Sequence, residues 1–192
     1  MNDVTTSTRI LWRSDEFNSA ERFTAGPTTG GWRLEGCVVV PVDGEPSDIQ
    51  YHVDLDAEWR TRRAVIEIHT AAGTRTINLA ADGEGQWDVQ GAPSQPLDGC
   101  IDIDLGFSPA TNTLQIRRLG LEVGEQHTLP VAWLSFPALE LQPLVQTYTR
   151  LGPSRWRYAS GTFSAELDVD PNGFVLRYGD DGLWMAVAHR PA

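Results

Sequence analysis

The stretch Ala64–Leu79 has the sequence AVIEIHTAAGTRTINL, and apolar and polar side chains alternate on both sides of a turn. Within Ala64–His69 and within Thr74–Leu79, apolar side chains recur at every second position, which is typical of a β-strand that buries one face. Ala72-Gly73, between them, is typical of a turn. The stretch therefore predicts a β-hairpin, and the same pattern extends along the chain in both directions.

Similar alternating runs, separated by Gly, Pro and Asp, cover most of the sequence. Another clear hairpin is Phe163–Val169, a turn at Asp170–Gly173, and Phe174–Tyr178. About a dozen strands occur at hairpin spacing, without a long helical period. A parallel α/β fold needs crossover helices, and the pattern offers none. The sequence predicts an all-β or mainly β protein with a single long antiparallel sheet, which would curl into a barrel or half-barrel or split into a sandwich.

The composition is that of one globular domain over residues 1–192, with residues 1–9 expected to be a flexible N-terminal arm. The formal net charge is −11, and all fifteen cationic side chains are Arg. Because a net anion is repelled by phosphate backbones, we expect no nucleic-acid partner. Cys37 and Cys100 stand far apart in the sequence, which indicates two reduced, buried thiols.

The first residues show no basic segment followed by an apolar one, so no signal peptide is expected. The longest apolar runs are also too short to cross a bilayer as a helix. We therefore expect a cytoplasmic protein without a membrane span.

The stretch Asp102–Arg118, DIDLGFSPATNTLQIRR, carries two carboxylates and two arginines around a turn. As a hairpin it would place Asp102 opposite Arg117 and keep its apolar face intact. One interpretation is a polar hairpin face with a cross-strand ion pair. The other places that face inside a curved sheet, where it would contact a sugar or phosphate headgroup.

Asp102 and Asp104 also raise the question of catalysis. An Asp-x-Asp pair can hold a metal in nucleotide-sugar transferases, but that use needs an α/β domain. The four histidines are scattered and no nucleophile elbow or phosphate loop is present, so we predict no metal, cofactor or catalytic residues. Neighbouring same-face carboxylates can form a glycosidase pair. A hydrolase that acts on a glycan or lipid ester through Asp102 and Asp104 therefore remains the alternative to a non-catalytic protein.

Seven tryptophans are spread through the chain, and most are expected in the core. Trp87 lies between Gln86 and Asp88, and Trp156 lies between two arginines. These two tryptophans are candidates for the wall of an amphipathic cavity.

Four segments, Tyr51–Arg63, Gly99–Arg118, Phe136–Leu151 and Phe163–Tyr178, together resemble a bacterial family described as Putative glycolipid-binding. The most specific run is the block from Asp102 to Arg118. The resemblance implies a long antiparallel sheet rolled into a half-barrel, similar to the periplasmic carriers of lipoproteins. It also implies a small amphipathic partner such as a glycolipid, with its apolar tail in the concave face of the sheet and its head at a polar rim.

Eight residues are therefore candidate ligand contacts. The polar candidates are Asp102, Asp104, Asn112, Arg117, Arg118 and Tyr148, and the wall candidates are Trp87 and Trp156.

Overall fold

A computed structural model describes residues 7–179 and 182–191. One half of its sheet contains β1 (Thr8–Ser14), β2 (Ser19–Thr28), β3 (Gly31–Val42), β4 (Glu45–Asp56), β5 (Thr61–Thr70), β6 (Gly73–Ala81), β7 (Trp87–Val89) and β8 (Ala92–Pro93). The other half contains β15 (Trp184–Arg190), β14 (Val175–Tyr178), β13 (Phe163–Val169), β12 (Arg155–Ser160), β11 (Leu141–Arg150), β10 (Gln126–Leu134) and β9 (Ile103–Leu105). Three short helices are η1 (Gln95–Leu97), η2 (Pro109–Thr111) and α1 (Asn112–Leu119).

The described strands form a single 15-stranded sheet that is not closed into a barrel. Its order runs from β8 through β7 to β1, then from β15 through β14 to β9. The pairing of β1 with β15 joins the first and last strands and therefore joins the two halves. The mainly β, curled sheet predicted from the sequence is confirmed. One pair departs from the antiparallel expectation, because β9 runs parallel to β10.

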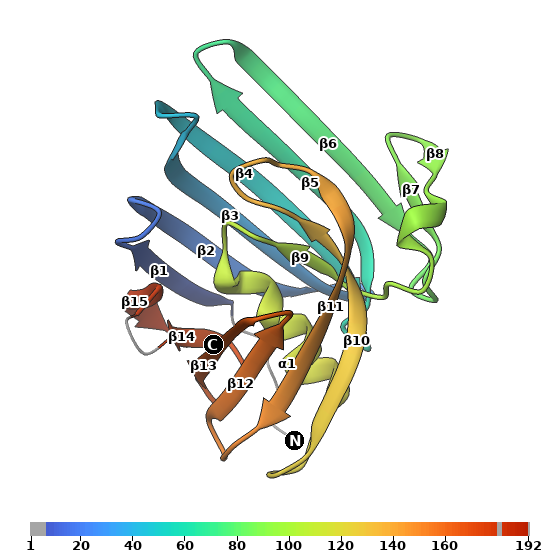
Figure 1. Ribbon diagram of the computed structural model, residues 1–192, viewed down its shortest axis with the longest axis vertical. Helices are drawn as coiled ribbons and strands as arrows, with labels where there is room; N and C mark the ends of the chain where they lie inside the picture. Colours follow the sequence, from blue (N-terminus) through green and yellow to red (C-terminus); the bar gives the residue numbers. More distant parts are fainter. Residues whose placement is uncertain (1–6, 180–181, 192) are drawn as a thin grey trace.

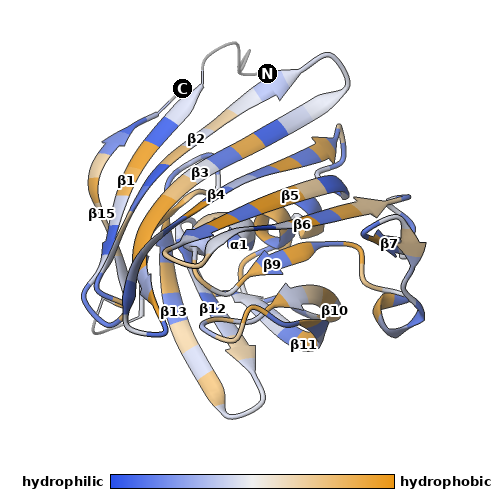
Figure 2. Cartoon of the chain, turned by 90° about the horizontal axis from the view of Figure 1, so that it is seen from above, coloured by the Kyte–Doolittle hydropathy of each residue, from blue (hydrophilic) through white to orange (hydrophobic). Residues whose placement is uncertain are grey.

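The alternating runs form the expected hairpins. In the β5–β6 hairpin, Ile66 lies opposite Ile77, and both side chains are buried. The Phe163–Tyr178 stretch forms β13 and β14, with a register shift next to Val169. Figure 2 shows apolar and polar positions alternating along β3–β6, above α1. The buried stripe of each strand faces this enclosed side of the sheet.

The hairpin expected over Asp102–Arg118 is wrong. Only Ile103–Leu105 forms a strand, and the rest of the stretch contains η2 and α1. Ser108 Oγ accepts a hydrogen bond from the Ala110 amide, and Pro109 occupies the first helical position, where its missing N–H is harmless. Gly120 ends α1 with a left-handed φ of 55°. These helix signals outweigh the short alternation in Leu114–Arg117. The parallel β9–β10 pair follows, because a crossover now separates the two strands.

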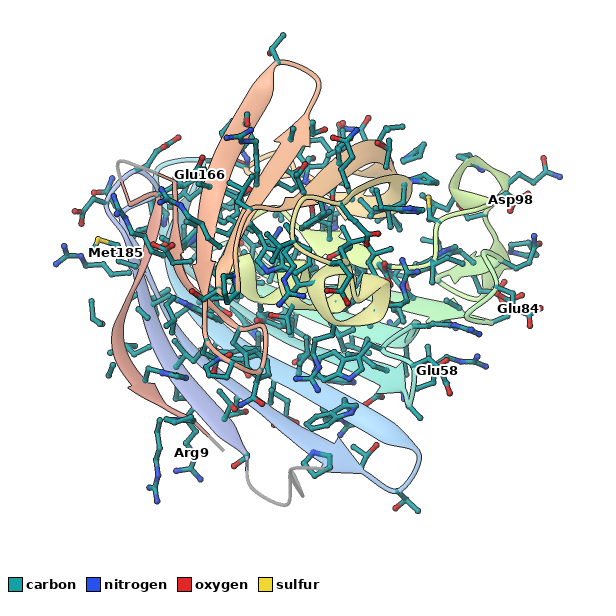
Figure 3. The ribbon with its side chains drawn as sticks, turned by 90° about the horizontal axis from the view of Figure 1, so that it is seen from below. Arg9, Glu58, Glu84, Asp98, Glu166 and Met185 are labelled. Atoms are coloured by element: carbon teal, nitrogen blue, oxygen red, sulfur yellow. The ribbon has the colours of Figure 1, made fainter. Side chains whose placement is uncertain are left out.

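The segment from β9 to α1 lies on the concave side of the sheet, and η1 lies at its edge beside β7 and β8 (Figures 1 and 2). The buried apolar side chains of the segment from β9 to α1 are Ile103, Leu105, Phe107, Ala110, Leu114 and Ile116. Figure 3 shows side chains crowding the space around α1, while Glu58, Glu84 and Asp98 lie at the outer edge. The protein's own chain therefore occupies most of the concavity that we expected to hold a ligand tail.

Two further expectations concern the chain ends and membranes. Thr8 and Arg9 belong to β1, so the flexible arm expected over residues 1–9 overlaps the sheet. Residues 1–6 lie outside the described part of the chain. No helix of the described residues is long and apolar enough to cross a membrane.

Candidate functional site

A pocket of about 340 Å³ opens beside β9 and η2. Seven aromatic side chains line it, and we call it the aromatic pocket: Phe17, Trp133, Phe136, Tyr158, Phe163, Tyr178 and Trp184. Its polar lining includes Glu16, Asp104, Ser108 and Asn112. The polar groups of Asp104, Ser108 and Asn112 therefore share this pocket with aromatic rings, most of which belong to the second half of the sheet.

Ring contacts connect six of the aromatic side chains that line the pocket, Phe17, Phe136, Tyr158, Phe163, Tyr178 and Trp184. The ring centroid of Tyr178 lies 6.1 Å from that of Tyr158 and 5.1 Å from that of Trp184. Phe17 lies 5.2 Å from Trp184 and 5.4 Å from Phe136. Rings at these separations support one another through tilted and edge-to-face contacts, which stiffen the wall.

Asp104 supplies the carboxylate of the aromatic pocket. Its Oδ1 accepts a hydrogen bond from Thr111 Oγ1 at 3.1 Å, and its Oδ2 accepts one from Gln146 Nε2 at 2.6 Å. The residue is 8% exposed, and no ion pair within the described residues involves it. Burial raises the pKa of the Asp104 carboxyl, against the opposing effect of these two hydrogen bonds.

Asn112 supplies an amide to the lining of the aromatic pocket, and Tyr148 binds this amide from the side away from the pocket. Asn112 Nδ2 donates to Tyr148 Oη at 2.7 Å, which connects α1 to β11. Tyr148 is fully buried and does not line the pocket. This bond orients the side chain of Asn112 at the pocket surface.

Ser108 is connected to a buried acid that sequence reasoning missed. Tyr51 Oη lies 3.3 Å from Ser108 Oγ and donates to Glu21 Oε1 at 2.5 Å. Burial raises the pKa of Glu21 to about 7, opposed by hydrogen bonds from Tyr51 and Ser108. The alternation of side chains along a strand could have revealed it, because Glu21 lies two residues before Phe23 and therefore shares the inward face of β2.

Asp102 and Arg118 form a structural ion pair away from the aromatic pocket. Arg118 Nη2 lies 2.5 Å from Asp102 Oδ2, and the Asp102 side chain is fully buried. Burial raises the pKa of Asp102, and Arg118 opposes that change. The expected partner of Asp102 was Arg117, so that pairing is wrong. Since Asp102 and Asp104 have separate partners, the structure does not bring them together as a pair of pocket carboxylates.

Arg117 and Trp156 border a separate hollow of about 270 Å³. The guanidinium carbon of Arg117 lies 4.2 Å from the ring centroid of Trp59 and 5.3 Å from that of Trp32. Arg150 covers the ring of Trp156 at 5.7 Å. Arg117 and Arg150 therefore pack on tryptophan rings through cation–π contacts.

Trp87 is a core residue, and its Nε1 donates to the Cys100 carbonyl at 2.6 Å. Of the eight candidates, only Asp104 and Asn112 line the aromatic pocket, with Tyr148 behind them. The pocket tryptophans are instead Trp133 and Trp184. Their flanking sequence is apolar, so nothing in the local pattern distinguished them from core residues.

A larger hollow of about 780 Å³ lies at the ends of β1–β3 and β15. It is lined by Ser7, which directly follows residues outside the described part, and by arginines of the outer face such as Arg9 and Arg22. It lacks the convergence of aromatic and buried polar groups found in the aromatic pocket. Within the described residues, no three His, Cys, Asp or Glu side chains gather as a metal site.

The fold is thus an open, curled β-sheet that encloses an aromatic pocket. Residues 9–184 match the family described as Putative glycolipid-binding, and the chain belongs to that family. The crystal structure of a DUF1089 family protein from Pseudomonas aeruginosa is similar, with a TM-score of 0.77 and 36% sequence identity, covering 84% of this chain and 89% of that chain. The family resemblance stated from the sequence is confirmed. No curated protein matches the chain.

Proposed function

We propose that this protein binds one small amphipathic ligand of the glycolipid type in the aromatic pocket and does not turn it over. The observation that carries the proposal is the placement of Asp104 and Asn112 opposite a wall of aromatic rings. Carboxylates and amides hydrogen-bond to sugar hydroxyls, while the C–H faces of a sugar and an alkyl chain pack on aromatic rings. The family description, Putative glycolipid-binding, supports the same class of ligand.

The dimensions of the pocket support a compact ligand. Its volume of about 340 Å³ lies near the lower end of the ~300–1,000 Å³ that is typical of ligand pockets. This space suits one sugar ring and the first part of an alkyl tail. Leu144, Leu183 and the half-exposed Phe163 also line it and offer an apolar path for the rest of the tail. The tail is therefore proposed here, and not along the concave face that α1 and its neighbours fill.

The separation of the two aspartates favours binding over hydrolysis. A glycosidase needs two carboxyl groups that flank one bond. Asp102 is held by Arg118 outside the aromatic pocket, so Asp104 lacks the partner that the hydrolase alternative assigned to it.

Tryptophan fluorescence tests the proposal, because two of the tryptophans line the pocket. Octyl glucoside, titrated below its critical micelle concentration, is expected to change the emission of the wild-type protein. Trp133→Phe or Trp184→Phe should reduce the change, and the core variant Trp87→Phe should retain it. Calorimetry that detects no binding of octyl glucoside or related octyl amphiphiles would contradict the proposal.

Native mass spectrometry of the purified protein gives an independent result. A bound amphiphile that is released by organic extraction would support the proposal. Its absence from Asp104→Leu, compared with its presence in Trp87→Phe, would assign it to the aromatic pocket.

A further inference from the structure

Asp104 is a buried acid, and no cationic side chain of residues 7–179 and 182–191 pairs with it. Its two hydrogen-bond donors, the Thr111 hydroxyl and the Gln146 amide, are neutral. Buried carboxylates are expensive unless a positive charge compensates them, so such a group either keeps its proton or gains a cation. Because Asp104 lines the aromatic pocket, a bound ligand can supply that cation.

The described lining of the aromatic pocket contains no Arg or His, and the chain has no Lys. The arginines nearest in sequence to its polar end are already engaged, since Arg118 pairs with Asp102 and Arg117 lies over the indoles of Trp32 and Trp59. Glu16 adds a second carboxylate at the exposed part of the lining. The charges around the pocket therefore oppose a phosphate or carboxylate headgroup.

The aromatic wall has the same preference as the carboxylate. The faces of aromatic rings carry negative electrostatic potential and attract ammonium groups, most strongly when both partners are desolvated. Trp133, Trp184 and Tyr178 present such rings to the space that Asp104 lines. Cages of aromatic rings are the usual recognition sites of quaternary ammonium ligands.

We infer that the headgroup of the ligand carries a positively charged nitrogen, as in an amino sugar or another alkylamine amphiphile. The inference rests on the proposed function and specifies its ligand class. The ammonium group would lie against Asp104 and the aromatic faces, while a neighbouring hydroxyl would contact Asn112. The alkyl part would leave along Leu144 and Phe163.

Three amphiphiles with the same tail test the inference: octyltrimethylammonium, octyl glucoside and octyl phosphate. Their affinities are measured by calorimetry below the critical micelle concentrations, at one pH and one ionic strength. The wild-type protein is expected to bind the ammonium compound about tenfold tighter than the glucoside and to bind the phosphate most weakly, as expected for a single desolvated charge pair. Equal affinities, or tightest binding of the phosphate, would overturn the inference and leave the binding function intact. If none of the three binds, both the function and the inference fail.

Asp104→Asn assigns the preference to its carboxylate. This variant should bind the ammonium compound and the glucoside within about twofold of each other. The matched control is Asp98→Asn, which removes the same charge at an exposed position that does not line the pocket (Figure 3). It should keep the wild-type order. If Asp104→Asn still binds the ammonium compound more tightly than the glucoside, the carboxylate of Asp104 is not the source of that preference. The wild-type series remains decisive if Asp104→Asn does not fold.

Discussion

Tyr51 Oη donates a hydrogen bond to Glu21 Oε1 at 2.5 Å, across the inner face of two strands that are not neighbours in the sheet. The ring of Tyr51 crosses β3 at Gly36, where a Cβ atom would lie 2.2 Å from Tyr51 Cε1. Glycine at this position therefore permits the contact. The second oxygen of Glu21 has no hydrogen-bond partner within the described residues.

Glu21 is expected to make the protein less stable as pH rises from about 5 to about 8. Its pKa is about 7 in the folded state and 4.5 without the fold. The folded protein therefore binds more protons between these values, and this contribution is complete below pH 4.5 and lost as pH rises through about 7. The difference corresponds to about 3 kcal/mol in the free energy of unfolding.

Chemical denaturation of the wild type and Glu21→Gln across this pH range checks the expectation. The glutamine variant cannot ionise, so its stability should depend less on pH. Parallel curves for the two proteins would show that Glu21 titrates normally.

Breaking the buried ion pair should destabilise the fold. Arg118→Met leaves the Asp102 carboxylate buried without its cation and is expected to cost about 3 kcal/mol. Asp102→Asn combined with Arg118→Met should recover part of that loss, because no uncompensated charge remains. Urea denaturation of the two single variants and the double variant measures the coupling. Additive effects would contradict a direct pair.

The end of α1 depends on a left-handed residue. Gly120 has a φ of 55°, which a residue with a Cβ adopts only with strain, so Gly120→Ala should cost about 1 kcal/mol. Gly30→Ala is the matched control, because a Cβ at Gly30 meets nothing within 4 Å and its φ is ordinary. Its unfolding free energy should stay within about 0.5 kcal/mol of the wild type. Equal losses in both variants would argue against the helix-ending role.

Tyr148→Phe should weaken both stability and ligand binding. It removes the acceptor of Asn112 Nδ2 inside the protein, which is expected to cost about 1–3 kcal/mol in the free energy of unfolding. The freed Asn112 side chain should then lower the affinity for octyl glucoside, although Tyr148 does not line the pocket. Calorimetry and thermal unfolding of this variant measure the two effects. If the variant is destabilised but binds octyl glucoside with unchanged affinity, the hydrogen bond from Asn112 to Tyr148 is not needed for ligand binding.

Sequence reasoning found Asp104 and Asn112, and it missed all of the aromatic residues that line the pocket. Asp104 was visible as one of the two carboxylates in the Asp102–Arg118 stretch, which carries polar groups at a regular spacing. Tyr178 and Trp184 instead come from strands at the end of the chain, and Phe17 comes from the turn after β1. Their encounter depends on the β1–β15 pairing, which no local pattern encodes.

The sequence by itself determined the alternating strands and their inward faces, because a period of two is a local consequence of backbone geometry. Its specific motifs indicated the family. It also contained the helix signals at Ser108, Pro109 and Gly120, which the hairpin interpretation did not use. Only the tertiary structure decided that Asp102 pairs with Arg118, that α1 fills the concavity and that Asp104 faces aromatic rings. Those relationships join residues far apart in the chain, and they arise when the curled sheet closes around its own core.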